Sequence, residues 1–247
     1  MTVTGSTRLF AIVGAPVAPL RSPALFNAAF AKLGHDAVFV AFEVAQGELP
    51  AAWAGLTRLR NLDGIVITMP HKQAVVPLLD ALGPTAKVTG SVNTVRRTAS
   101  GGWEGDMFDG EGFRDGLERA GHPPRGAAIL QIGCGAAGRA DALAAALAAG
   151  FPALAVSFGP PSPRGHDIVV NATPMGLHAG DPLPLDPAEL VASQIVADVI
   201  PNPEITALVA AARALGCATV TGQLMHEGQA RLAASYLGID GWESATS

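Results

Sequence analysis

The fold of this chain is decided by residues 128–138, Ala-Ile-Leu-Gln-Ile-Gly-Cys-Gly-Ala-Ala-Gly. Residues 128–132 predict a buried strand, and the alanine-rich run 136–149 predicts a helix. Between them, Gly133, Gly135 and Gly138 stand at the spacing that permits a tight turn, close approach of a pyrophosphate and close helix–strand packing. A helix that begins there offers free N–H groups to phosphate. The stretch therefore predicts a dinucleotide-binding turn in a Rossmann-like unit.

The composition excludes several classes of protein. The chain has 247 residues, of which 49% are hydrophobic and 15% charged, so it can bury a sizeable core in one large domain or two smaller ones. A net charge of -5 without a basic cluster argues against a nucleic-acid partner. Two cysteines indicate neither a disulfide framework nor a thiolate metal site, and no metal is predicted. No apolar run reaches the ~18 residues of a membrane span, so we expect a cytoplasmic protein without membrane contact.

The first half of the chain alternates predicted strands and helices. Strands are expected at residues 9–13, 37–43 and 63–68, followed by an edge hairpin of residues 91–97 and 102–105. Helices are expected at residues 22–33, 49–59, 73–82 and 85–87, the first with Ser22 as N-cap and proline at its first position. This order predicts a mostly parallel sheet with helices on both faces.

The second half continues the pattern around the glycine-rich turn. Residues 108–120 form the bridge into this half, with a helix that begins at Asp109. Further strands are expected at residues 153–158, 168–172, 195–199 and 218–220, and further helices at residues 204–215 and 223–237, before a loose polar tail. We therefore predict an α/β protein of two domains. Residues 1–106 with the C-terminal helix 223–247 form an α/β sandwich that binds the substrate, and residues 107–222 form a Rossmann-like NAD(P)-binding domain.

Four polar residues of the sequence are candidates for a ligand site. Lys72 and Thr68 follow the carboxyl end of a buried parallel strand, where open α/β sheets bind ligands. A lone lysine at such a place is more often solvated surface. Asn93 lies in an apolar segment, where a satisfied structural amide is the simpler interpretation. Asp109 begins a helix, and a capping carboxylate would explain it equally well. Each of these signals is weak when taken alone.

In order along the chain, however, the motifs resemble those of the shikimate dehydrogenase family. The matching segments are Gly14-Ala15-Pro16, Arg21-Ser22-Pro23, Asn27-Ala28-Ala29-Phe30, Ile67-Thr68-Met69-Pro70-His71-Lys72, Gly90-Ser91-Val92-Asn93-Thr94, Asp109-Gly110-Glu111-Gly112-Phe113, the glycine-rich turn, residues 167–176, Asp198-Val199 and residues 222–229. The resemblance extends over about residues 9–237. It implies a two-domain oxidoreductase that reduces 3-dehydroshikimate to shikimate with NADPH.

The resemblance also implies roles for individual residues. Lys72 and Asp109 match the catalytic pair, in which an ammonium donates to the developing alkoxide and a carboxylate orients it. Ser22, Thr68, Asn93 and Gln229 match substrate-binding residues. The cofactor-binding positions are Gly133, Cys134, Gly135, Ala136, Ala137, Gly138, Asn171, Thr173, Pro174, Met175 and Gly222. We expect a small cyclic hydroxy acid as substrate and a monomer or homodimer.

The chain departs from the family pattern at the expected substrate site. The family's Ser-x-Ser-Pro, which binds the substrate carboxylate, is here Leu20-Arg21-Ser22-Pro23. The family's Asn-Thr-Asp is Met107-Phe108-Asp109, and Pro201 stands where a tyrosine is usual. Each change removes polar groups, so either Arg21 compensates or the acid is a relative of shikimate.

A second departure concerns the cofactor. Between the strand ending at Phe158 and Asp167 lie only residues 159–166, fewer than the dozen or so that a helical crossover needs. Arg164 could meet a 2′-phosphate, but its three neighbouring prolines favour a structural loop. We therefore expect NADP as cofactor, with NAD possible and with weak or absent binding as an alternative.

Three functions remain open on the sequence. The leading hypothesis is an NAD(P)-dependent shikimate dehydrogenase-like oxidoreductase of aromatic amino acid biosynthesis. The second is a non-redox binding or regulatory protein of the same fold with a degenerate cofactor site. The third is a methylenetetrahydrofolate dehydrogenase-type enzyme, which should lack the combination of Asn93, Asp109 and Gln229.

Overall fold

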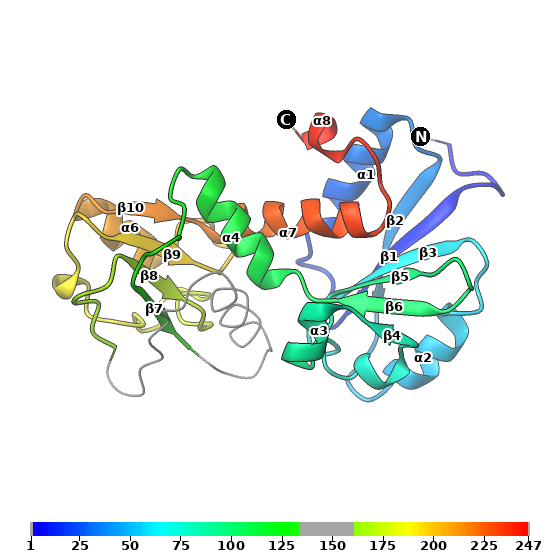
Figure 1. The fold of residues 1–247 in the computed structure, drawn as a ribbon, viewed down its shortest axis with the longest axis horizontal. Helices are drawn as coiled ribbons and strands as arrows, with labels where there is room; N and C mark the ends of the chain where they lie inside the picture. The colour runs from blue at the N-terminus through cyan, green and yellow to red at the C-terminus, as the bar shows by residue number, and fades with distance from the viewer. Residues whose placement is uncertain (1, 134–160, 247) are drawn as a thin grey trace. The chain divides into compact units, whose positions relative to one another are not determined.

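The chain forms two compact units. The computed structural model describes residues 2–133 and 161–246. One unit consists of Met1–Phe108 with Ala230–Ser247, and the second is Asp109–Gln229 (Figure 1). The predicted helix 136–149, the predicted strand 153–158 and the turn residues Cys134, Gly135, Ala136, Ala137 and Gly138 lie outside the described residues.

A six-stranded mixed sheet forms the centre of the first unit. Its strands are β1 (Arg8–Gly14), β2 (Ala37–Glu43), β3 (Leu62–Ile67), β4 (Ala81–Leu82), β5 (Thr94–Arg97) and β6 (Trp103–Asp106), in the order β2-β1-β3-β5-β6-β4. The first three are parallel, while β5 is antiparallel to both β3 and β6. The carboxyl ends of β1 and β3 therefore share an edge with the start of β5 and the end of β6.

Alternating side chains divide the core of this unit between the two faces of its sheet. Phe10 and Ile12 of β1 pack with α1 (Ser22–Leu33), the end of α7 (Gly222–Tyr236) and α8 (Trp242–Thr246). Ala11 and Val13 face the opposite side, where α2 (Leu49–Leu56) and α3 (Pro84–Thr89) lie. This period of two is what a strand buried on both faces requires.

The predicted helix 73–82 is wrong. The segment forms a turn, the 3₁₀ helix η1 (Val76–Leu78) and the two-residue strand β4. Pro77 has no N–H to donate to a helix, and Ala81 and Leu82 pair with β6. The same pairing corrects a second prediction, because β4 occupies the edge of the sheet and the hairpin of β5 and β6 lies inside it.

The expectation of a loose tail after Gly238 is also wrong. Residues Trp242–Thr246 form α8, and the Trp242 side chain is 5% exposed. Its ring lies 4.6 Å from that of Phe26, measured between centroids. Trp242 and Ile239 are buried in the aromatic core and Ala245 packs against it, so apolar burial anchors this segment.

The second unit contains a parallel sheet. Its described strands are β7 (Ile129–Ile132), β8 (Ile168–Asn171), β9 (Ile195–Asp198) and β10 (Ala218–Val220), in the order β10-β9-β8-β7. Every neighbouring pair is parallel, so the carboxyl ends of the described strands meet at one edge. This is the arrangement expected of a Rossmann-like sheet.

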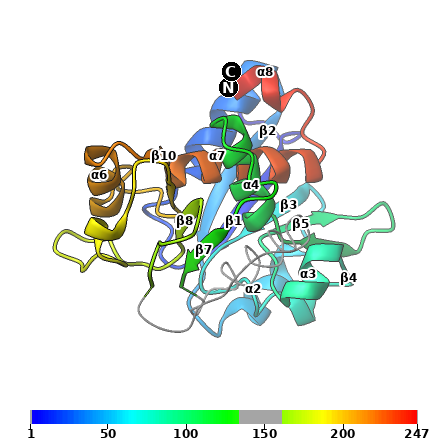
Figure 2. The same ribbon diagram turned by 60° about the vertical axis from the view of Figure 1, so that its left-hand side comes forward.

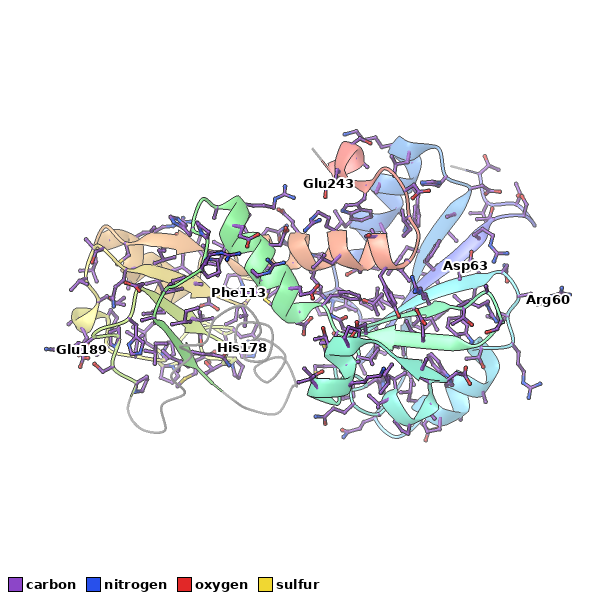
Figure 3. The ribbon with its side chains drawn as sticks, viewed as in Figure 1. Arg60, Asp63, Phe113, His178, Glu189 and Glu243 are labelled. Atoms are coloured by element: carbon purple, nitrogen blue, oxygen red, sulfur yellow. The ribbon has the colours of Figure 1, made fainter. Side chains whose placement is uncertain are left out.

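Helices cover both faces of this sheet. The helix α4 (Asp109–Arg119) and the start of α7 lie on one face. Phe113 of α4, labelled in Figure 3, belongs to the same buried cluster as Ile129 and Ile168 of the sheet. The helix α6 (Ala207–Ala214) lies on the other face beside β9 and β10, near η2 (Pro187–Glu189) (Figure 2). Within the described residues, no helix combines the length and the hydropathy needed to span a bilayer.

Candidate active site

The loops that follow β1 and β3 are joined at the carboxyl edge of the first sheet. Thr68 donates its N–H to the Val13 carbonyl at 2.9 Å, and Ala15 donates to the Met69 carbonyl at 2.9 Å. A Cβ on Gly14 would lie 2.3 Å from the Thr68 side chain, so only glycine fits there. Thr68 is thereby placed against the end of β1.

Lys72 lies in the turn that follows. Its side chain is 6% exposed, which excludes the solvated-surface interpretation. The turn is fixed from two directions: the His71 Nε2 lies 2.7 Å from the Val44 carbonyl, and the Val92 N–H donates to the Lys72 carbonyl at 2.8 Å. A buried ammonium is costly unless it serves a partner, so Lys72 has the burial expected of a functional group.

Asn93 lies at the same edge, directly before β5. It is fully buried, and its carbonyl accepts the Ile67 N–H at 2.8 Å. Its Oδ1 accepts the Phe108 N–H at 3.1 Å and the Thr94 hydroxyl at 3.2 Å. These bonds fix the orientation of the carboxamide. The bond from Phe108 comes from its backbone N–H and does not depend on its side chain. The replacement of the family's threonine by Phe108 therefore leaves this anchor intact.

Asp106 is a buried residue of this edge that the sequence analysis did not identify. Its Oδ1 accepts the N–H groups of Ala86 and Met107 at 2.7 and 2.9 Å. A Cβ on Gly83 would lie 2.1 Å from the Asp106 Oδ2, so the glycine before α3 makes room for the carboxylate. A buried acid at a strand end, three residues before an acid of the matched motif, is the signal that could have found it. Asp106 fixes the segment that leads to Asp109.

Ser22 and Leu20 lie at the start of α1. Arg21, not Ser22, is the N-cap, and Ser22 is the first helical residue and is buried. The predicted N-cap is therefore wrong by one position. Leu20 is half-buried and packs against the aromatic core around Phe26 and Phe30. The side chain that replaces the family's hydroxyl thus contributes to the core.

In the second unit, Asp109 and Gln229 stand at the two points where the chain enters and leaves it. Asp109 is 1% exposed at the first position of α4. Gln229 is half-buried on α7. A Cβ on Gly228 would lie 2.4 Å from the Gly112 carbonyl oxygen, so α4 and α7 make backbone contact beside both residues.

The carboxyl edge of the second sheet has the features of a dinucleotide site. Gly133 follows β7 with a φ of 103°, and a Cβ there would lie 2.6 Å from the Thr173 side chain. Both its conformation and its surroundings require glycine, as the first position of a phosphate-binding turn does. Gly133 therefore fits the dinucleotide cofactor that the glycine-rich motif implies.

The segment Asn171–Gly176 forms a second loop at this edge. Asn171 is fully buried, and its Oδ1 accepts the Thr173 N–H at 3.0 Å and the Thr173 hydroxyl at 2.7 Å. The Thr173 hydroxyl oxygen accepts the Met175 N–H at 3.0 Å. Side-chain hydrogen bonds thus order the predicted cofactor residues Asn171, Thr173 and Met175, with Pro174 between the last two.

Arg164 and Gln194 show how the loop before β8 is built, in which the sequence places Arg164. The Arg164 side chain is 80% exposed, and its Nε lies 3.9 Å from the Glu189 carboxylate. The loop around it is held by Gln194, whose Nε2 donates to the carbonyls of Pro163 and His166 at 2.6 and 2.9 Å. The described part of this loop, residues 161–167, contains neither helix nor strand, as a structural loop should.

Comparison with known proteins identifies the family. Residues 12–95 match the family model described as the shikimate dehydrogenase substrate binding domain. The chain is 37% identical over 252 residues to a shikimate dehydrogenase (NADP(+)) of Rubrobacter xylanophilus, covering 90% of this chain and 88% of that protein.

Solved structures agree. A shikimate 5-dehydrogenase of Thermus thermophilus, in complex with NADP(H) and shikimate, has a TM-score of 0.82 and 30% identity over 97% of this chain and 98% of its own. A quinate dehydrogenase of Corynebacterium glutamicum, in complex with NAD, has a TM-score of 0.80 and 29% identity over 97% of each chain. The chain belongs to the shikimate dehydrogenase family.

Proposed function

We propose that this chain is an NADP(H)-dependent oxidoreductase that reduces 3-dehydroshikimate to shikimate, a step of aromatic amino acid biosynthesis. The observation that carries the proposal is the burial of Lys72 beside Thr68 and Asn93 at one sheet edge, within the segment that matches the substrate-binding model. The shikimate dehydrogenases among its relatives support the same reaction. They favour it over a non-redox binding protein and over a folate enzyme.

In this reaction Lys72 and Asp109 are the catalytic pair. The Lys72 Nζ donates a hydrogen bond to the carbonyl oxygen and a proton to the alkoxide that develops there. When bound, NADPH supplies the hydride that reduces the carbonyl carbon. The Asp109 carboxylate orients the ammonium. Within the first unit, Asn93 binds the backbone N–H of Phe108, the residue that precedes Asp109 in the sequence.

The remaining assignments concern binding. Ser22, Thr68, Asn93 and Gln229 bind the substrate's oxygen atoms. The cofactor is held by Gly133, Cys134, Gly135, Ala136, Ala137, Gly138, Asn171, Thr173, Pro174, Met175 and Gly222. Accordingly, the first unit serves as the substrate domain and the second as the dinucleotide domain.

A related cyclic hydroxy acid is the second candidate substrate. Leu20 replaces a family hydroxyl and packs into the core, which lowers the number of donors available to a carboxylate. A relative of similar fold is a quinate dehydrogenase that was solved with NAD. Both acids and both cofactors therefore belong in the test.

The test is a titration of purified protein with NADPH and with NADH, followed by fluorescence, alone and with shikimate or quinate. We expect saturable binding of NADPH and oxidation of shikimate in the presence of NADP⁺. Turnover of quinate but not of shikimate would identify quinate as the substrate. Binding of an acid without any cofactor binding or turnover would contradict a redox function. We further propose a cytoplasmic monomer or homodimer, which size-exclusion chromatography with light scattering would distinguish.

A further inference from the structure

Asp198 is a buried carboxylate to which the proposed reaction gives no role. It ends β9 and is 1% exposed. Its Oδ1 accepts the Ile200 N–H at 3.0 Å, and its Oδ2 accepts the Thr206 hydroxyl at 2.8 Å and the Asn171 Nδ2 at 3.2 Å. Burial raises the pKa of Asp198, and these hydrogen bonds oppose that rise. All three donors are uncharged. Burial of the Asp198 carboxylate therefore costs folding free energy that an apolar side chain at this position would not cost.

The bond to Asn171 decides how its carboxamide is turned. Because a carboxylate only accepts, the group that faces Asp198 must be the Nδ2 of Asn171. The same Nδ2 donates to the Met175 carbonyl at 3.0 Å. The Oδ1 of Asn171 must then point to Thr173, from which it accepts two hydrogen bonds. Asp198, the Met175 carbonyl and the Thr173 N–H therefore all favour the same one of the two possible orientations of this amide, and among these three Asp198 is the one that acts from a different strand.

This orientation reaches the glycine-rich turn through one contact. Thr173 packs on Gly133 so closely that a Cβ on the glycine would lie 2.6 Å from the Thr173 Cγ2 and 3.0 Å from its backbone nitrogen. A chain of contacts thus runs from Asp198 through Asn171 and Thr173 to the first residue of the dinucleotide turn.

We propose that Asp198 is a positioning residue for the cofactor, which holds Asn171 so that the segment Asn171–Gly176 lies against Gly133 in the geometry that receives the dinucleotide. The inference rests on the proposed NADP(H)-dependent function. It adds to that function a residue that acts through Asn171 and does not itself touch the substrate. In Asp198→Asn the NH₂ of the new amide must face either the Ile200 N–H or both the Asn171 Nδ2 and the Thr206 hydroxyl, so in either rotamer a donor meets a donor while the size of the side chain is unchanged.

The first measurement needs no cofactor. Amide hydrogen exchange of Thr173 and Met175 in the full chain reports their bonds to the Asn171 and Thr173 side chains. We expect faster exchange at both amides in Asp198→Asn. Asp186→Asn is the matched control, since the Asp186 side chain caps η2 by accepting the Ala188 N–H at 3.0 Å, and it should leave both amides unchanged.

The second measurement is the dissociation constant of NADPH, with the KM values of NADP⁺ and shikimate. Asp198→Asn should weaken NADPH binding about tenfold, as expected for the loss of one hydrogen bond to a charged group. The KM of shikimate should change much less. Native exchange rates and native NADPH affinity in a folded variant would overturn the inference. If the wild type neither binds NADPH nor turns over, the proposed function fails, and the exchange experiment still decides what Asp198 does to the loop.

A second pair of variants applies if Asp198→Asn does not fold. Thr206→Val removes one donor to Asp198 and the side-chain cap of α6, whereas Thr206→Ser keeps the hydroxyl. If Asp198 positions the cofactor loop, folded Thr206→Val binds NADPH more weakly than the wild type, and Thr206→Ser binds it with wild-type affinity. Equal NADPH affinity in both would contradict the positioning role, because a purely stabilising role lowers the melting temperature without changing the affinity of the folded protein.

Discussion

A methyl group on Gly112 would lie 2.6 Å from the backbone nitrogen of Gln229, so the first turn of α4 and the middle of α7 are in backbone contact. Side chains cannot give way at such a contact, because the atoms that would clash belong to the main chain. The contact lies three residues after Asp109. It couples the positions of two residues that we assign to the site.

Gly112→Ala should therefore destabilise the second unit by about 1–3 kcal/mol, the usual effect of overpacking. Thermal unfolding followed by circular dichroism measures it. Gly55→Ala is the matched control, because Gly55 also lies in a helix, and a Cβ there meets nothing within 4 Å. The control should be neutral or slightly stabilising. Equal melting temperatures for the two variants would show that α4 and α7 can separate at no cost.

Lys72→Ala should lower kcat for shikimate oxidation by roughly 100- to 10,000-fold, the range of general acid–base groups. Lys87→Ala, at an exposed position of α3, should retain wild-type turnover. Steady-state kinetics with NADP⁺ compare the two, and circular dichroism checks that both are folded. Undiminished turnover in Lys72→Ala would remove this residue from the mechanism.

Tyr236, the single tyrosine of the chain, should titrate abnormally. Burial and the neighbouring Glu104 carboxylate raise its pKa above the ordinary 10.0. Above pH 10 the folded protein therefore keeps a proton that the unfolded chain releases, and stability should fall as the pH rises further. Phenolate absorbance at alkaline pH follows Tyr236 alone. Glu104→Gln should lower its pKa, and an unshifted titration in the folded wild type would contradict the assignment.

Trp242→Ala should destabilise the first unit by about 3–5 kcal/mol, since it empties a buried aromatic site. The ring packs on Phe26 from a short helix at the end of the chain. Val88→Ala, at a side chain that is 75% exposed, is the control and should be near neutral. Urea unfolding gives both values. A small effect of Trp242→Ala would mean that α8 contributes little to the core.

Leu20→Ser tests the substrate. The serine restores a hydroxyl that can bond a carboxylate, at the expense of apolar contact with the core. We expect a lower KM for shikimate together with a lower melting temperature. Steady-state kinetics with shikimate and with quinate show for which acid the KM falls. A higher KM for both acids would indicate that Leu20 itself shapes the pocket.

Local patterns predicted most of the fold. The bounds expected for Ser22–Leu33, Ala37–Glu43 and Ala218–Val220 agree with the structure, because apolar periodicity and glycine stops decide them locally. The helix expected at residues 73–82 failed, since β4 forms only by pairing with β6, far along the chain. The order of α8 also depends on a distant partner, Phe26, and could not be read from its polar composition.

For the candidate site too, the sequence predicts the local motifs but not the contacts between distant segments. The motifs identified Lys72 and Asn93, but their burial became evident only when the strands were assembled. Asp106 was missed because its carboxylate serves the N–H groups of Ala86 and Met107, and the first of these lies in a separate helix. The one signal in the sequence is its place at a strand end three residues before Asp109, and that signal does not show which N–H groups the carboxylate binds.

The division of the chain has a consequence for its synthesis. The second unit is one continuous segment, Asp109–Gln229, inserted between the two parts of the first. The core of the first unit needs Ala233, Ala234 and Trp242, which leave the ribosome after the whole second unit. The unit that is begun second can thus be finished first, and the exposed sheet of the nascent first unit must be protected from aggregation in the meantime.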